Sequence, residues 1–163
     1  MIYVKPVVGI VMGSQSDWDT MRHAKETLDS LGINSKPVVI SAHRTPKRLT
    51  EYATRARDDG LKVIIAGAGM AAALPGAIAA LSPLPVLGVP MEGKVAGGLD
   101  AILSMVQMPA GIPVGALAVG RPGAVNAALF AASILALSDP NIARALNQFR
   151  DEQTKAVSEE PQS

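Results

Sequence analysis

One short segment places a histidine beside an arginine, directly after an apolar run: Ser41-Ala42-His43-Arg44-Thr45-Pro46. Histidine is the side chain most easily poised for proton transfer near neutral pH, and a guanidinium can hold a phosphate or carboxylate through two N–H groups. These residue types predict acid–base chemistry by His43 on an anionic group bound by Arg44. The alternative is that the segment only begins a helix and that its histidine is incidental. The other histidine, His23, lies in a charged helical pattern, and we expect it to face solvent.

A second polar cluster, Gly13-Ser14-Gln15-Ser16-Asp17, follows the first apolar run. A glycine allows a sharp turn, serine hydroxyls donate hydrogen bonds, and the first N–H groups of a helix are free to bind an anion. The combination predicts a phosphate-binding turn, whereas ordinary helix capping would explain only one of the two hydroxyls. The carboxylate of Asp17 would repel a phosphate at contact distance, so we expect it to suit ribose hydroxyls.

A glycine-rich turn at residues 67–76 follows the third apolar run. Its first six residues, Gly67-Ala68-Gly69-Met70-Ala71-Ala72, match the dinucleotide pattern G-x-G-x-x-A, but they follow the third strand rather than the first, and a Pro-Gly pair interrupts the expected helix. We therefore interpret the turn as a floor where a planar ligand lies against backbone. Residues 104–111 carry no polar cluster suited to catalysis, and they suit a ligand wall or a subunit contact.

The elements that must position these turns alternate along the chain. Runs that are apolar on both faces and separated by helices indicate a parallel sheet covered on both sides. We expect strands at residues 7–12, 37–40, 63–66, 86–89 and 114–119, and helices at 17–31, 46–59 and 124–137, with a last amphipathic helix marked by Ile142, Leu146 and Phe149. The pattern predicts an α/β fold, a flavodoxin-like three-layer sandwich with a parallel five-stranded sheet. Ligands of such sheets bind outside the carboxyl ends of the strands, where the polar turns lie.

The composition bounds the organisation and excludes several function classes. The 163 residues are 48% hydrophobic and 18% charged, which predicts one domain over residues 1–163, with a core at 7–150 and a frayed tail at 158–163. A net charge of +1 provides no basic excess for nucleic acid. With no cysteine and two histidines, we expect no disulfide and no transition-metal site. No apolar run is long enough to span a bilayer and no signal peptide is evident, so we expect a soluble, cytoplasmic protein without a membrane partner.

Small residues are unusually abundant, with 26 Ala and 15 Gly against only 3% aromatic residues. The mean hydropathy of +0.27 is high for a small soluble monomer. We expect apolar surface to be buried between subunits of a homo-oligomer.

Together these segments resemble the class I N5-carboxyaminoimidazole ribonucleotide mutases, bacterial enzymes of purine synthesis. The matching pieces run in the family order over residues 7–150: Gly-Ser-Gln-Ser-Asp-Trp at 13–18, Ser-Ala-His-Arg-Thr-Pro at 41–46, Val-Ile-Ile-Ala-Gly-Ala-Gly at 63–69, Leu-Pro-Gly at 74–76, Ser-Met-Val-Gln-Met-Pro-Ala-Gly at 104–111 and Asn126-Ala127-Ala128-Leu129.

The resemblance implies an isomerase that moves a carboxylate from the exocyclic nitrogen to ring carbon C4 of aminoimidazole ribonucleotide, with no metal, ATP or organic cofactor. It also implies a homo-octamer with sites at subunit junctions. His43 matches the catalytic proton carrier of the family, and Ser14, Asp17 and Arg44 match substrate-binding positions. Beside them we expect substrate contacts from Ser16, Ser41, Ala42, Gly67, Ala68, Gly69 and Met70.

The chain departs from the family pattern Gly-Ala-Gly-Gly-Ala-Ala-His-Leu-Pro-Gly at two positions. Met70 stands where the family has glycine, and Ala73 stands where it has a second active-site histidine. If that glycine needs a positive φ, Met70 also strains the turn. Two alternatives therefore stay open: a diverged relative that carboxylates or decarboxylates another heteroaromatic ribonucleotide, and a non-catalytic ribonucleotide-binding scaffold. Class II carboxylases, which use free carbon dioxide on the same fold, fit the motifs less well.

Overall fold

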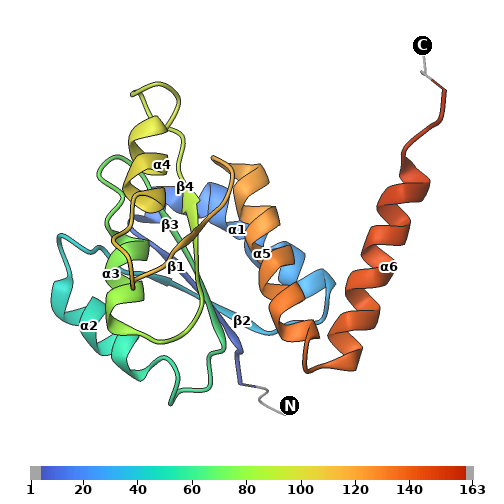
Figure 1. Ribbon diagram of the computed structural model, residues 1–163, viewed down its shortest axis with the longest axis horizontal. Helices are drawn as coiled ribbons and strands as arrows, with labels where there is room; N and C mark the ends of the chain where they lie inside the picture. The colour runs from blue at the N-terminus through green and yellow to red at the C-terminus, as the bar shows by residue number, and fades with distance from the viewer. Residues whose placement is uncertain (1–4, 161–163) are drawn as a thin grey trace.

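Five parallel strands form a single sheet in the computed structural model, which describes residues 5–160 (Figure 1). The strand order is β2-β1-β3-β4-β5, the order of flavodoxin-like sheets, so the predicted fold class is confirmed. Chain winding reverses between β1 and β3, and such a reversal leaves a crevice at the carboxyl ends of the strands. The strands are β1 (Val8–Met12), β2 (Ser35–Val39), β3 (Val63–Ala68), β4 (Val86–Pro90) and β5 (Gly115–Ala116).

Helices cover both faces of this sheet and make the sandwich three layers deep (Figure 1). On one face lie α2 (Pro46–Arg55), α3 (Leu74–Leu81) and α4 (Leu99–Val106). The other face is covered by α1 (Trp18–Ser30) and α5 (Arg121–Ala136), and α6 (Pro140–Ala156) packs on the outer side of α5. A short 3-10 helix, η1 (Gln15–Asp17), leads into α1. Among residues 5–160, no helix combines the length and apolar character needed to cross a membrane.

The strand predictions hold best in the middle of the sheet. All residues of β1, β3 and β4 are buried, as expected for strands covered on both faces. The edge strand β2 differs, because it is half-buried to exposed, begins before the predicted residues 37–40 and carries Pro37, which an edge strand tolerates. The other edge strand, β5, is much shorter than the predicted 114–119, since only Gly115 and Ala116 pair with β4.

The helix predictions erred mainly where proline or glycine was interpreted as a break. The Pro-Gly pair at 75–76 does not interrupt a helix, because the proline lies in the first turn of α3, where its missing N–H costs nothing. Pro122 likewise lies in the first turn of α5, so that helix begins before the predicted residue 124. In contrast, α2 ends at Arg55, earlier than the predicted residue 59.

The sequence analysis missed α4 altogether, and part of the segment at 104–111 belongs to that helix. The final helix is confirmed as α6, and of the predicted frayed tail, residues 158–160 lie exposed beyond it while 161–163 fall outside the described residues.

Close backbone packing, rather than large side chains, holds α5 against the end of the sheet. Gly123 is buried in the first turn of α5, directly against the backbone carbonyl of Ala118. A Cβ atom at position 123 would overlap that carbonyl oxygen, which belongs to backbone and cannot rotate away. Many of the buried positions along α5 are alanine, so the helix approaches its neighbours closely over its length.

We predict that Gly123→Ala destabilises the protein by about 1–3 kcal/mol, although Gly→Ala in a helix normally stabilises by about 1 kcal/mol. The overlap with Ala118 outweighs the gain in helix propensity. Chemical denaturation measures the effect, and Asn126→Ala, an exposed position on the same helix, serves as the control that should be neutral or stabilising. A Gly123→Ala protein as stable as the control would contradict the close approach.

Candidate functional site

A cleft of about 500 Å³ opens at the carboxyl ends of β1, β2, β3 and β4. The loops after β1 and β2 bring to it the polar residues singled out in the sequence, the turn after β3 adds small and apolar residues, and the loop after β4 adds Met91 and Glu92. The lining residues are Gly13, Ser14, Ser16, Asp17, Ser41, Ala42, His43, Arg44, Ala68, Gly69, Met70, Ala71, Leu74, Met91 and Glu92. The cleft thus lies at the chain reversal between β1 and β3, where the topology predicts a ligand.

The loop after β1 is built as a capping turn. The Ser14 hydroxyl accepts a hydrogen bond from the Ser16 backbone N–H at 3.3 Å, and the Ser16 hydroxyl donates to it at 2.9 Å. In return, the Ser14 backbone N–H donates to Asp17 Oδ2 at 3.0 Å, which completes a capping box. The two hydroxyls and the first N–H groups of η1 are therefore held together at the edge of the cleft. The capping alternative is therefore observed at this turn, while anion binding by it stays a prediction.

The loop after β2 is fixed by side-chain bonds to its own backbone. Thr45 Oγ1 donates to the Ser41 carbonyl at 2.9 Å and accepts from the Ser41 N–H at 3.0 Å. The Arg44 guanidinium donates through Nε to Ser41 Oγ at 3.2 Å and through Nη2 to the Gly13 carbonyl at 3.1 Å. Arg44 therefore links the second loop to the first. Its neighbour His43 is exposed and lines the same cleft.

The Asp17 carboxyl at the edge of the cleft is partly buried. Its partial burial raises the pKa of Asp17 above the ordinary value of 3.8. Backbone N–H groups of Ser14 and Gly13 and the positive charge of Arg44 act in the opposite direction, lowering this pKa, but they do not cancel the effect of burial.

Beside the cleft, two methionine side chains pack against the backbone of Gly67, in the space that a larger side chain would occupy. Gly67 is buried in β3, and a Cβ atom there would lie 2.5 Å from Met21 Sδ and 2.8 Å from Met91 Cε. Gly67 does not itself line the cleft, so its predicted substrate contact stays a prediction, and a larger residue there would have to displace the ends of these two methionine side chains. At Gly69, a Cβ would lie 3.2 Å from Met91 Cβ, which also keeps this part of the floor narrow.

The departure at Met70 has the backbone conformation that glycine favours. Met70 has φ 55°, in the left-handed region, and its carbonyl accepts a short-range bond from the Ala72 N–H at 2.8 Å. The expected strain at this residue is therefore present. Its side chain lines the cleft, whereas Ala73, at the start of α3, is exposed and lies outside the lining set.

Four lining residues escaped the sequence analysis as site residues: Ala71, Leu74, Met91 and Glu92. Met91 and Glu92 directly follow β4, so the rule that ligands bind beyond the carboxyl ends of strands could have found them. The expectation for His23 was wrong, because its side chain is only 16% exposed and its Nδ1 lies 3.1 Å from Glu26 Oε2 on the same helix. Within residues 5–160, no group of three or more His, Asp or Glu side chains could hold a metal ion.

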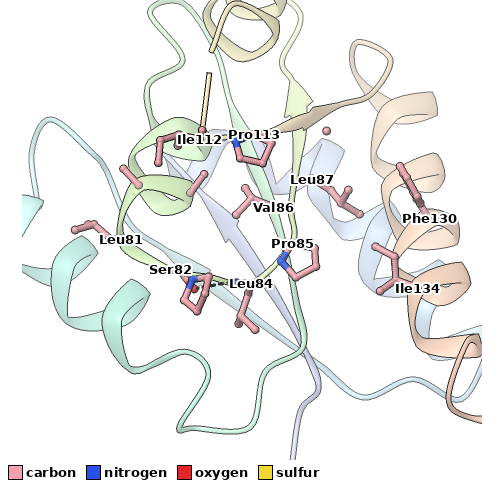
Figure 2. Close-up of a pocket in the computed structure, with 15 residues that line it drawn as sticks. Leu81, Ser82, Leu84, Pro85, Val86, Leu87, Ile112, Pro113, Phe130 and Ile134 are labelled. Atoms are coloured by element: carbon pink, nitrogen blue, oxygen red, sulfur yellow. Dashed lines mark hydrogen bonds between the residues drawn. The ribbon is translucent and has the colours of Figure 1, made fainter. Parts of the chain in front are cut away.

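A second, larger hollow of about 770 Å³ lies at the opposite ends of the strands and carries no charged residue (Figure 2). Leu81 of α3, Leu87 of β4, and Phe130 and Ile134 of α5 contribute to its wall, together with the proline-rich segment between α3 and β4. Its apolar character suits packing against protein rather than catalysis.

Comparison with known proteins agrees with this geometry. The family model described as AIR carboxylase matches residues 7–156. The chain belongs to the AIR carboxylase family. It is 59% identical to the N5-carboxyaminoimidazole ribonucleotide mutase of Brucella melitensis, over 94% of this chain and 95% of the relative. It is 55% identical to the mutase of Pseudomonas aeruginosa, over 95% of each. The crystal structure of Treponema denticola PurE superposes with a TM-score of 0.84 over 92% of each chain, at 28% identity.

For this member of the AIR carboxylase family, the raised pKa of Asp17 gives a pH-dependent prediction. An acid whose folded pKa is raised stabilises the fold when protonated, and this contribution is lost as the pH rises through the folded pKa. We therefore expect Asp17→Asn, whose amide oxygen can still accept from Ser14, to be at least as stable as the parent at pH 7. The advantage should shrink as the pH falls towards 3.8. Thermal unfolding across this range measures the difference, and an advantage that grows towards low pH would refute the assigned direction.

Proposed function

We propose that this protein converts N5-carboxyaminoimidazole ribonucleotide to 4-carboxyaminoimidazole ribonucleotide, with His43 as the proton carrier. The observation that carries the proposal is the meeting of His43, Arg44 and the serine turn in one cleft, in a chain 59% identical to a relative named as this mutase. As part of the proposal, the enzyme acts in the cytoplasm, because a phosphorylated substrate is too polar to leave across a membrane.

The substrate's charged end fits the polar wall of the cleft. Ser14 and Ser16 hydroxyls and the N–H groups of η1 would bind the phosphate, with the guanidinium of Arg44 nearby to balance its charge. Asp17, already held by the Ser14 N–H, would accept bonds from ribose hydroxyls rather than contact the phosphate. The imidazole ring would then lie over the narrow floor at Ala68 and Gly69, beside His43.

The reaction needs one group that first gives and then takes a proton. Protonated His43 donates to the exocyclic nitrogen as its bond to the carboxylate carbon breaks; the bonding pair stays on nitrogen, and carbon dioxide is released beside aminoimidazole ribonucleotide. Ring carbon C4 then attacks carbon dioxide and forms the new C–C bond. Neutral His43 removes the proton from C4, which restores the aromatic ring and returns His43 to its starting state. No proton or electron is gained or lost over the cycle.

Retention of carbon dioxide requires a wall that does not favour water. Part of the cleft wall is apolar, because Ala68, Leu74 and Met91 line it and each of these three is buried. Holding the two fragments together there supplies a high effective concentration for the second step.

Isotope labelling distinguishes this mutase from a carboxylase that draws on free carbon dioxide. Freshly prepared substrate with 13C in its N-carboxylate is incubated with the protein in unlabelled bicarbonate and carbonic anhydrase. A mutase retains most of the 13C in the C4-carboxylate. A product carrying mainly unlabelled carbon would instead identify a carboxylase. No product would refute the mutase and leave the diverged relative and the binding scaffold as the alternatives.

We predict that His43→Asn lowers turnover by at least about 100-fold while leaving ribonucleotide affinity largely intact, because proton transfer is lost and the phosphate contacts remain. The assay follows the loss of ultraviolet absorbance of 4-carboxyaminoimidazole ribonucleotide in the reverse direction. His23→Asn is the matched control, since His23 pairs with Glu26 outside the cleft and its loss should leave turnover intact. Unchanged turnover in His43→Asn would remove His43 from the mechanism.

The proposed enzyme is a homo-oligomer, with an octamer as the expected assembly, and a second copy covers the uncharged hollow. Support comes from the lack of charge in its wall together with the exposure of Leu81 and Phe130, apolar side chains on two different helices around it (Figure 2). An exposed apolar wall of this kind is typical of subunit contacts.

We predict that Phe130→Glu dissociates the assembly to a smaller species, because it places a charge in an apolar contact. Light scattering coupled to gel filtration measures the mass. Leu137→Glu is the control: Leu137 is 88% exposed just after α5 and does not line the hollow, so its mutant should keep the parent mass. A monomeric parent, or a Phe130→Glu protein of parent mass, would contradict this interface.

A further inference from the structure

One methionine differs sharply from the others in its exposure to solvent. The Met70 side chain is 75% exposed, whereas Met12, Met21, Met91 and Met105 are at most 6% exposed and Met108 is half-buried. The sequence contains no cysteine, so methionine provides all of its sulfur. Among residues 5–160 of a single subunit, one thioether is therefore far more open to a water-soluble oxidant than the others.

The position of Met70 joins this exposure to the cleft. Its left-handed backbone and the tight bond from the Ala72 N–H to its carbonyl set the residue at the apex of the turn after β3. From there the side chain lines the same cleft as His43 and Arg44. Met91 lines the cleft too, but it is 6% exposed and packs beneath the glycine floor. Oxidation at Met70 would thus change the cleft wall while leaving the core packing untouched.

We propose that Met70 is a site of reversible oxidation by hydrogen peroxide and that its sulfoxide weakens ribonucleotide binding. The thioether sulfur gives an electron pair to one peroxide oxygen, the O–O bond breaks, and the products are methionine sulfoxide and water. Sulfur loses two electrons and peroxide gains them, so the step needs no other reactant. Sulfoxide reductases restore the thioether with two electrons taken from thiols, which become a disulfide, and the oxygen leaves as water.

The effect on binding follows from the change in polarity. Oxidation turns a flexible apolar side chain into a polar one whose oxygen carries partial negative charge. In the cleft proposed to bind a ribonucleotide, that oxygen repels the phosphate and carboxylate and favours water at the apolar wall. This consequence rests on the proposed function, whereas the selectivity of oxidation depends on exposure alone.

Peptide mapping tests the selectivity without any assay of activity. The intact protein is treated with limiting hydrogen peroxide, and the gain of one oxygen is followed for each methionine-containing peptide by mass spectrometry. We expect Met70 to oxidise at least about tenfold faster than Met12, Met21, Met91 and Met105. Saturating 4-carboxyaminoimidazole ribonucleotide should slow oxidation of Met70 several-fold. Equal rates for all of these methionines would overturn the proposal.

Calorimetry with 4-carboxyaminoimidazole ribonucleotide then tests the consequence. After stoichiometric oxidation of Met70, Kd should rise at least about threefold relative to untreated protein. Met70→Leu, treated in parallel, should keep the Kd of its own untreated sample, since leucine cannot form a sulfoxide. An unchanged Kd after oxidation of the parent, or an equal rise in Met70→Leu, would overturn the switch. Selective oxidation and weakened binding in a protein with no turnover would leave the switch standing and refute only the proposed reaction.

Discussion

The whole site depends on the parallel pairing of β1 with β3, two strands separated in sequence but adjacent in the sheet. Their register runs from Val8 opposite Val63 to Met12 opposite Gly67, and the Gly13 N–H continues it by donating to the Gly67 carbonyl at 3.1 Å. Because this pairing extends past the end of β1, the serine turn begins beside the glycine floor. Because the strands on both sides of the chain reversal are buried and parallel, the loops that follow them come together at the carboxyl edge of the sheet.

Arg44 connects the loop after β2 to this pair of strands. Its bond to the Gly13 carbonyl crosses from the loop after β2 to the loop after β1, and its bond to Ser41 holds the guanidinium against its own loop. The same cation lowers the pKa of Asp17, although burial of that carboxyl has the larger, opposite effect. One side chain therefore sets both the spacing of the two polar loops and part of the electrostatics between them.

Strands and site loops could be predicted from the sequence where an apolar run is followed directly by polar turn residues. The strands β1, β3 and β4 followed from apolar runs, and the serine and histidine turns followed from their positions after such runs. The sequence was insufficient at the edges of the sheet, where β2 is partly exposed and β5 contributes only two paired residues. Each edge strand pairs with only one neighbour and is not buried on both faces. Its residues are therefore not uniformly apolar, and the sequence does not mark its ends clearly.

The helices and the cleft residues were also predicted only in part. The helix α4 went unpredicted, and its exposed residues Leu99, Leu103 and Val106 explain why: an apolar outer face obscures the polar–apolar alternation by which a surface helix is recognised. Met91 and Glu92 were missed as cleft residues because no motif marks them, and only the topology brings them to the edge shared with His43.

The glycine-rich turn shows how backbone geometry and chemistry are coupled at one residue. Gly67 and Gly69 lie in close contact with methionine side chains, Met21 and Met91 at Gly67 and Met91 at Gly69, whereas Met70 tolerates an unfavourable φ. A left-handed residue at the apex of a turn projects its side chain away from the packed floor, which accounts for both its exposure and its place in the wall of the cleft. The cost of the conformation, about 1–2 kcal/mol for a residue with a Cβ, is small beside the burial that holds β3. The fold can therefore carry a reactive, solvent-facing thioether beside its proposed acid–base group without losing the framework that positions either one.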